Sequence, residues 1–437
     1  MRRKTLETGD RLLCFIFLTK YFPTCYMVVG AHAFVVLETV CSNSLEWNFN
    51  CWFASLDLKK TFDRIEHVSL FRALHHHGVD HEYVKLITML YREQTGYIKG
   101  GRAFAIERGV RQGDVISPLF FNAGLELALE RWKRRLGDCG LHVGCTERLT
   151  NVRYADDLVL FAKSWCELVR MLEILIEELH GIGLALNPSK TKLFTTFGVD
   201  TPTLIEVAGH FLEVVIRQES HKYLGKMLSG NFTERRVADL AYRKKCAWNK
   251  FRKFKHILLN KHISLRLRLR FFDSVISPTI LFGLATTALP KSEISKLDSL
   301  RRRMLRHIVG WVRVEGETWN VTMRRMNTRL LQAQQLLPMR LWSESLYLAK
   351  FRLAFRVARA NHGWPQTILQ WDPQQAWQFN FEDKPCRSRG RPPTRWDDCL
   401  RKFVLNTFGQ ESWLIEARNR HGWLAEEQTF LNFCRML

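Results

Sequence analysis

Two adjacent aspartates, Asp156 and Asp157, interrupt an apolar run that extends from Tyr154 to Ala162. Tyr, Val, Leu and Phe favour strands, and an Asp pair inside such a run tolerates the tight turn of a two-residue hairpin. Packing gives no reason for two carboxylates here, because burying unpaired charges is costly. The pattern therefore predicts a β-hairpin with both carboxylates projecting from its tip.

A third carboxylate, Asp57, ends the short apolar run 52–56 further up the chain. The residues that follow it are typical of a turn leading into a helix. If this run pairs with the hairpin, Asp57 and Asp156 lie side by side, because neighbouring strands are about 4.8 Å apart. Such a group suits two Mg²⁺ ions, with Mn²⁺ as a substitute, in phosphoryl transfer. For Asp57 alone, a turn-forming role is the simpler interpretation.

Five blocks in a fixed order make the sequence recognisable. They are SLDLKKTFDRI at 55–65, GVRQGDVISPLFFN at 109–122, YADDLVLFA at 154–162, GLALNPSKTK at 183–192 and YLG at 223–225. With these blocks the chain resembles an N-terminally truncated reverse transcriptase of non-LTR, LINE-type retrotransposons. A group II intron maturase, which shares the YADD tetrad, is the weaker match.

The resemblance implies a role for residues in each block. The expected catalytic residues are Asp57, Asp156, Asp157 and Lys190, and the expected metal ligands are Asp57, Asp156, Asp157 and the backbone carbonyl of Leu58. The residues expected to contact the nucleotide are Leu58, Phe62, Gln112 and Gly113. The expected primer grip consists of Tyr223, Leu224 and Gly225. Phe62 would exclude a ribose 2′-hydroxyl by bulk, and Lys190 would steady the departing pyrophosphate.

Simpler interpretations stay open for several of these residues. Phe62 is alternatively a core aromatic at a helix start, and Lys190 a solvated surface lysine with Lys192 in its place. Arg111 and Asp114 are equally well read as a local structural pair.

Local patterns predict the scaffold around the site. Ser117 and Pro118 predict a helix start with a capping hydroxyl and a first-turn proline. Ser164 and Glu167 predict a capping box for a helix that Gly181 ends. Residues 32–47 favour a last fingers helix, and 211–216 with 221–225 favour two strands joined by a polar turn, expected to hold the primer 3′ end.

The formal net charge of +23 points to a polyanionic partner. Between Arg235 and Asp273 basic residues accompany a helical apolar stripe, which fits a membrane surface or a thumb gripping duplex phosphates. Its position after the polymerase blocks favours the thumb. The residues expected to contact nucleic acid are Arg243, Lys244, Lys245, Lys250, Arg252 and Lys253.

These features predict an α+β fold, a right-hand polymerase palm with an antiparallel sheet, partial fingers and a mostly helical C-terminal region. The expected parts are partial or degenerate fingers (1–50), palm (51–230), helical basic thumb (231–335), helical region (336–385), a basic Pro/Gly linker able to touch RNA (386–396) and a helical tail (397–437). No fingers motif is recognisable in residues 1–30, and no endonuclease domain is expected.

The cysteines predict neither disulfides nor a strong metal site. All eleven are scattered without CxxC pairs. Cys386, Cys399, His421 and Cys434 recur in the tail at spacings that fit no known zinc knuckle. The scattered cysteines favour a reducing intracellular compartment, and we expect a nuclear location. No apolar stretch reaches about 18 residues, so we expect no membrane span.

Two functions from different classes follow. One is an RNA-directed DNA polymerase that uses an RNA template, a DNA primer or RNA–DNA duplex, and dNTPs. The other is a catalytically inactive remnant whose basic thumb still binds nucleic acid. Intact carboxylates favour the first, and the short fingers region favours the second.

Overall fold

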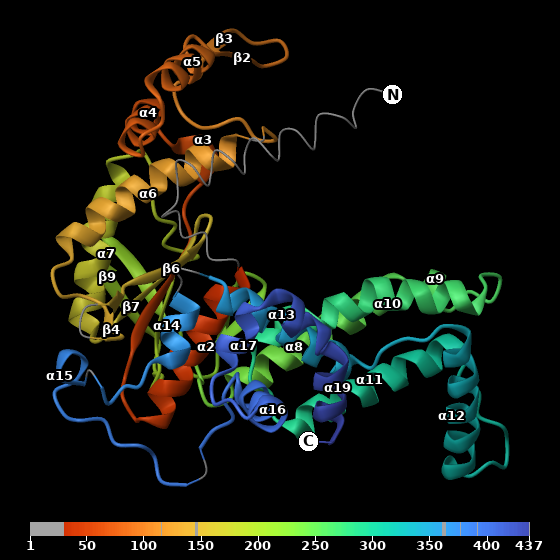
Figure 1. Cartoon of the computed structure of the whole chain (residues 1–437). Helices are drawn as coiled ribbons and strands as arrows, with labels where there is room; N and C mark the ends of the chain where they lie inside the picture. Colours follow the sequence, from red (N-terminus) through yellow and green to blue (C-terminus); the bar gives the residue numbers. More distant parts are fainter. Residues whose placement is uncertain are drawn as a thin grey trace. The chain divides into compact units, whose positions relative to one another are not determined.

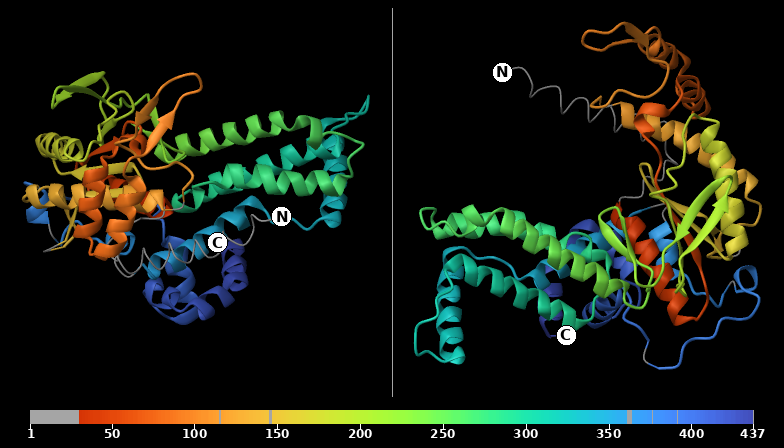
Figure 2. Two further views of the ribbon diagram at one scale, coloured as in Figure 1. Left: turned by 90° about the horizontal axis from the view of Figure 1, so that it is seen from above. Right: turned by 180° about the vertical axis from the view of Figure 1, so that it is seen from behind.

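The structure is a computed structural model that describes residues 30–114, 116–144, 147–360, 364–375, 377–390 and 392–436. The segment without a fingers motif lies almost wholly outside these residues. The chain divides into two compact units. The sheet unit comprises 1–33, 47–224 and 370–388, and the helical unit comprises 34–46, 225–369 and 389–437. Figures 1 and 2 show the sheet and the long helices that distinguish them.

A six-stranded sheet in the order β6-β7-β1-β8-β10-β9 forms the centre of the sheet unit. Its strands are β1 (Trp52–Leu56), β6 (Asn151–Tyr154), β7 (Asp157–Ala162), β8 (Lys192–Thr195), β9 (Thr203–Val207) and β10 (His210–Val214). Neighbouring strands are antiparallel except β8 and β10, which are parallel. The α+β class is confirmed, and the sheet is mixed where we expected an antiparallel one.

Apolar sequence explains the central position of β1 and β7. Nearly every residue of both strands is buried, as expected of strands covered on both faces. Phe53 of β1 stacks on Phe194 of β8 with ring centroids 4.9 Å apart. Helices α6 (Ser117–Arg135) and α7 (Trp165–His180) pack together, and Trp132 of α6 donates its indole N–H to the Met171 carbonyl at 2.8 Å. This core holds the site strands in place.

The starts of these two helices test two local predictions. The Ser164 hydroxyl caps α7 by accepting the Glu167 backbone N–H at 3.3 Å, as predicted, whereas the Glu167 carboxylate accepts the Lys163 N–H in place of the reciprocal bond of a capping box. The predicted capping by Ser117 is wrong, because Ile116 occupies the cap position and no side chain caps α6. Pro118 does lie in the first turn. Ser117 is almost fully buried instead, so its hydroxyl belongs to the core.

Shorter elements complete the sheet unit. They are α3 (Thr61–Arg64), α4 (His67–His76), α5 (His81–Tyr91), β2 (Thr95–Tyr97), β3 (Ala103–Ala105), β4 (Leu141–His142), β5 (Arg148–Leu149), β11 (Ser220–Tyr223) and α15 (Trp377–Asn380). The hairpin β2–β3 and helix α5 expose several large apolar side chains, among them Leu90, Tyr97 and Ile98.

The strands near residue 220 pair differently from the prediction. We expected 211–216 and 221–225 to form one hairpin. Instead β10 lies in the main sheet between β8 and β9, and β11 forms a two-stranded sheet with β12 (Lys226–Ser229). The reason is local, because Leu224 (φ 45°) and Gly225 (φ 84°) both adopt the left-handed backbone of a tight hairpin turn.

The helical unit consists of β12 and a series of helices. They are α2 (Gly30–Glu46, which starts in the sheet unit), α8 (Arg235–Lys253), α9 (Lys255–Leu258), α10 (Leu265–Leu281), α11 (Lys291–Val309), α12 (Trp319–Leu336), α13 (Trp342–Ala358), α14 (Trp364–Gln370, which ends in the sheet unit), α16 (Asp398–Phe408), α17 (Trp413–Arg418), α18 (Arg420–Ala425) and α19 (Glu427–Met436), with a 3₁₀ turn at Leu284–Thr286.

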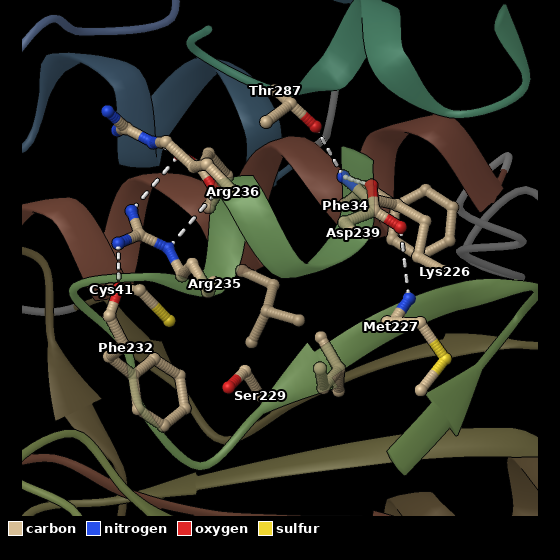
Figure 3. A pocket seen from close by; sticks show the side chains of 13 residues that line it. Phe34, Cys41, Lys226, Met227, Ser229, Phe232, Arg235, Arg236, Asp239 and Thr287 are labelled. Carbon is tan, nitrogen blue, oxygen red and sulfur yellow. Dashed lines mark hydrogen bonds and ion pairs between the residues drawn. The ribbon is translucent and has the colours of Figure 1, made fainter. Parts of the chain in front are cut away.

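A buried ion network ties α2 into this unit (Figure 3). Arg235 and Arg236 both pair with Glu38 of α2, at 3.0 and 2.6 Å. Burial opposes ionisation of Glu38, yet the two arginines outweigh it and hold the pKa of Glu38 below its ordinary value. Lys226 donates to Thr287 at 2.7 Å and lies 3.8 Å from Asp239. The helix expected in the fingers thus belongs to the helical unit.

The end of the basic Pro/Gly segment is anchored within the helical unit. Arg395 pairs with Glu46 at 2.7 Å. The Trp396 indole N–H donates to the Ala285 carbonyl at 2.7 Å, and Lys350 donates to the Trp396 carbonyl at 3.0 Å. Trp396 is only 3% exposed. These two residues therefore act as a structural attachment and are poorly placed to touch RNA.

One stretch of the described chain, Leu265–Thr286, is long and apolar enough by composition to cross a membrane. Such a single stretch is weak evidence, because core helices pass the same test. Its residues Leu269, Phe272, Ile276 and Ile280 are fully buried in the helical unit's core.

Candidate active site

A two-residue turn positions the first carboxylates. Tyr154 pairs with Asp157 across β6 and β7, which leaves Ala155 and Asp156 as the turn. Ala155 adopts the left-handed backbone that such a turn requires, with φ 56°. The predicted hairpin is therefore present. Asp156 lies at its tip, and Asp157 is the first residue of the returning strand.

Asp57 reaches the same place from β1. In the register of β1 and β7, Leu56 pairs with Leu158. Continuing this register by one residue sets Asp57 opposite Asp157, and facing residues of antiparallel strands have Cα atoms about 4.5 to 5.5 Å apart. Asp57 therefore faces Asp157 most directly, where we had expected Asp156.

Hydrogen bonds orient the carboxylates. The Asn187 side-chain amide donates to Asp57 Oδ2 at 2.8 Å, and the Thr61 hydroxyl donates to Asp156 Oδ2 at 3.2 Å. The Asp57 backbone N–H donates to the Thr191 hydroxyl at 3.3 Å. Our sequence reasoning missed these three partners. They lie in the same blocks as the expected site residues, and that proximity was the available signal.

Crowding of negative charge perturbs Asp157. Burial, together with the neighbouring carboxylates of Asp156 and Asp57, raises the pKa of Asp157 to about 6. Each carboxylate disfavours ionisation of its neighbours when no cation lies between them. The structure therefore brings Asp57 and Asp156 within electrostatic reach of Asp157.

The donor chemistry of this group fits a hard divalent cation, because carboxylate oxygens are the ligands that Mg²⁺ prefers. The arrangement of these side chains fits an ion less well than their chemistry does. Within the described residues, no group of three His, Cys, Asp or Glu side chains lies close enough together to hold a metal ion. Asp57 and Asp156 are instead turned toward Asn187 and Thr61. Ligation would require these side chains to rotate away from those partners.

Two lysines were candidates for the position beside the leaving group. Lys190 is exposed and lies 3.7 Å from Asp57 Oδ2. Lys192 forms an ion pair with Glu213 on the neighbouring strand. The structure therefore brings Lys190 to the carboxylates and engages Lys192 elsewhere.

The ring of Phe62 packs against a second aromatic ring. It is half-buried at the start of α3 and stacks on Phe121 of α6, with centroids 5.0 Å apart. The Gln112 amide donates to Asp63 at 3.0 Å, which brings the second block onto the first. Leu58 is buried and its backbone bridges to Leu186. Phe62 is thus a packed aromatic at a helix start, and its partial exposure leaves the predicted nucleotide contact open to it.

Gly109 connects these blocks by a close backbone approach. Its φ is +88°, and a Cβ at this position would lie 2.9 Å from the Phe62 carbonyl oxygen. Its N–H donates to the Ile65 carbonyl at 2.8 Å. Gly113 also has a positive φ, but a Cβ there would meet nothing within 4 Å. Asp114 accepts the Ile116 N–H at 3.1 Å, and its backbone contacts Arg111.

The YLG block forms the turn after β11. Tyr223 is buried, and burial, aided by the Asp157 carboxylate, raises the pKa of its hydroxyl. This interaction sets Tyr223 near the acidic group. Leu224 and Gly225 occupy the turn itself.

The basic residues of α8 divide into buried and exposed ones. Arg243 is buried, donates to the Gly225 carbonyl and lies 4.7 Å from the Phe282 ring centroid. It is unavailable to phosphates, so the expectation for Arg243 is corrected. Lys244 is half-buried and 3.4 Å from Glu293. The exposed members of the expected set are Lys245, Lys250, Arg252 and Lys253.

The tail cysteines gather no metal site within the described residues. Burial raises the pKa of Cys399, and Cys434 is also buried. All eight cysteines that the structure describes are free thiols.

A mixed sheet that carries acidic residues on a hairpin tip, backed by two helices, defines a polymerase palm. Residues 35–228 match the reverse transcriptase (RNA-dependent DNA polymerase) family. This part of the chain is therefore similar to the reverse transcriptases of non-LTR retrotransposons.

Several retrotransposon proteins are similar to the chain. A transposon-derived protein of Caenorhabditis elegans is 25% identical over 63% of the chain and 94% of its own length. The Pol polyprotein of the type-2 retrotransposable element R2DM of Drosophila melanogaster is 32% identical over 36% of the chain. An R2 Pol polyprotein of Popillia japonica is 24% identical over 85% of the chain.

The chain spans 15% of the Drosophila polyprotein and 59% of the Popillia protein. Among solved structures, a telomerase of Candida albicans matches 80% of the chain and 55% of its own length, with 17% identity and a TM-score of 0.36. That likeness is too low to bear on function.

Proposed function

We propose that this chain is an RNA-directed DNA polymerase that extends a primer 3′-hydroxyl with deoxynucleotides on an RNA template. The observation that carries the proposal is the electrostatic coupling of Asp57, Asp156 and Asp157 where β1 meets the hairpin tip. The match of residues 35–228 to the reverse transcriptase family supports RNA as the template.

Asp57, Asp156 and Asp157, with the Leu58 carbonyl, would hold two Mg²⁺ ions. When bound, these ions lower the pKa of the attacking primer hydroxyl and neutralise charge on the departing pyrophosphate. Asn187 and Thr61 hold Asp57 and Asp156 by hydrogen bonds, which ligation of an ion would have to replace.

Lys190 would act on the leaving group. Its ammonium is exposed and lies 3.7 Å from Asp57 Oδ2. A lysine in that position can donate a proton to pyrophosphate or stabilise its charge. Lys192 is less suited because Glu213 holds it.

Phe62 would select deoxynucleotides. The ring of Phe121 supports it from behind, so it has little room to move away from a ribose 2′-hydroxyl. Gln112 and Gly113 would contact the incoming nucleotide, and Tyr223, Leu224 and Gly225 would position the primer end. The exposed lysines and arginine of α8 would bind duplex phosphates. The nuclear location stays a prediction.

A nucleic-acid-binding remnant is the second candidate, and one observation favours it. Among the described residues no three side chains are already arranged to hold a metal ion. If the carboxylates cannot close around an ion, the basic helices would still bind RNA or duplex while the polymerase reaction fails.

One assay separates the two candidates. The chain would be given an RNA template, a DNA primer and dNTPs with Mg²⁺, beside an Asp156→Asn, Asp157→Asn double variant. The polymerase proposal expects extension by the parent alone. Extension by neither protein, with RNA binding retained by both, would contradict it and support the remnant.

A further inference from the structure

The loop 310–318 and helix α12 carry an aromatic pair that the polymerase site does not use. Trp311 and Trp319 lie with ring centroids 5.7 Å apart, and their planes are inclined by 48°. Trp319 is 59% exposed, although it is among the largest apolar side chains. Large exposed aromatics on a folded surface commonly mark a binding site.

Hydrogen bonds hold the loop against α12. Arg325 pairs with Glu317 at 2.8 Å and also donates to the Val312 carbonyl at 2.8 Å. The Thr322 hydroxyl donates to Glu317 at 2.9 Å. The side-chain hydrogen bond from Arg325 lowers the pKa of Glu317 to about 2. The tryptophan pair is therefore built into a fixed loop.

The charge around this pair is positive. Residues 302–329 contain seven arginines and two glutamates. Arg325 already compensates Glu317, so Glu315 is the remaining acid near the exposed Arg313 and Arg324. Exposed valines at 312, 314 and 321 add apolar surface. Basic and aromatic side chains together fit a partner that carries both phosphates and flat bases.

We infer that Trp311, Trp319 and the adjacent arginines form a binding site for single-stranded RNA, separate from the polymerase centre. Aromatic rings bind unpaired bases by stacking, and arginines bind the flanking phosphates. A duplex hides its base faces and gains little from such a pair. The alternative occupant, another protein, would not require the surplus of arginine.

The test uses a fluorescein-labelled 12-nucleotide single-stranded RNA and a 12-base-pair RNA–DNA duplex, without nucleotides, on the full chain. Fluorescence anisotropy should show that Trp319→Ala weakens binding of the single strand on the order of tenfold and changes duplex binding less than twofold. Trp319→Leu, which keeps apolar bulk, should lose as much. Leu331→Ala, equally exposed on the same helix, should change neither.

A second readout locates the RNA. A 4-thiouridine version of the same RNA should crosslink to peptides within 310–324. Unchanged single-strand affinity in Trp319→Ala, full affinity in Trp319→Leu, or crosslinks confined to α8 would each overturn the inference. So would unchanged RNA binding with loss of self-association in Trp319→Ala, which would mark a protein interface. Because no step requires polymerisation, an inactive polymerase centre would not affect these results.

Discussion

Asp157 combines partial burial with two acidic neighbours. Burial and the carboxylates of Asp156 and Asp57 raise its pKa to about 6. An acid whose pKa is raised by folding stabilises the fold below its unfolded pKa, near 4, and loses that contribution as pH rises through about 6. Without metal, the site therefore opposes folding most strongly at neutral pH.

Replacing the Asp157 carboxylate by a neutral amide tests how its ionisation affects stability. In EDTA, the thermal midpoint of Asp157→Asn minus that of the parent should increase between pH 4 and pH 7. Adding Mg²⁺ at pH 7 should stabilise the parent and reduce the difference. A difference that stays constant across this range would contradict the coupling of Asp157 to its neighbours.

Gly109 and Gly113 form a matched pair for a backbone test. Both have positive φ, but only at Gly109 would a Cβ meet backbone atoms closer than 3.0 Å. Gly113→Ala should cost about 1 kcal/mol for the left-handed backbone. Gly109→Ala should cost about 2 to 3 kcal/mol, because the Phe62 carbonyl cannot move freely. Equal losses in denaturant unfolding would show that the two blocks do not approach closely.

At the level of elements, the sequence predicted which segments form strands and helices better than it predicted which strands pair. The apolar run 52–56 and the Asp-interrupted run both form strands, and the Ser164 cap works as predicted. The pairing of β10 and β11 was wrong, because Leu224 took a left-handed conformation that its side chain gives no reason to expect. The predicted capping role of Ser117 was wrong because this residue is buried in the core.

The residues of the candidate site also divide into those that the sequence predicted and those that it did not. The three acids were predictable from their residue type and position in apolar runs. Residue type did not identify Thr61 and Asn187, because their contacts with Asp156 and Asp57 join residues 95 and 130 positions apart; only their place in the same blocks pointed to them. The burial of Arg243 was hidden for a similar reason, since it depends on Gly225 and Phe282.

Helix α8 supplies a test of the phosphate-binding face. Substituting Gln for the exposed residues Lys245, Lys250, Arg252 and Lys253 removes up to four phosphate contacts. The slope of log affinity for an RNA–DNA duplex against log salt should then fall by roughly 3 to 4. Arg243→Gln serves as the contrast, because its buried guanidinium should contribute to stability and leave the slope unchanged. A slope unaltered by the fourfold substitution would place the duplex elsewhere.

Trp396 tests whether the Pro/Gly segment is a structural attachment. Trp396→Ala should destabilise the helical unit by about 3 to 5 kcal/mol, since it removes a buried indole and its hydrogen bond to Ala285. Trp319→Ala, at an exposed position, should change stability by less than about 0.5 kcal/mol. Thermal unfolding compares the two. A small loss in Trp396→Ala would mean that the segment is held loosely.

At the scale of the whole molecule, the net charge and the division into two units indicate which parts of the chain would bind nucleic acid and which would hold the catalytic residues. The net charge of +23 favours a nucleic-acid partner at any of several basic faces. The sheet unit contains every proposed catalytic residue, whereas the proposed duplex and single-strand contacts lie in the helical unit. The six-part division proposed from the sequence stays a prediction, although residues 34–46 group with the helices.

The central claim is that Asp57 and Asp157 act in one catalytic centre. Single-turnover incorporation of one deoxynucleotide on an RNA template would be measured for Asp57→Asn, Asp157→Asn and the double variant, with the exposed Asp200→Asn as control. We predict that each site substitution slows incorporation by roughly a thousandfold or more, that the double variant is scarcely slower than either, and that Asp200→Asn stays within tenfold. Incorporation by Asp57→Asn within tenfold of the parent, or losses that multiply in the double variant, would contradict a single shared centre.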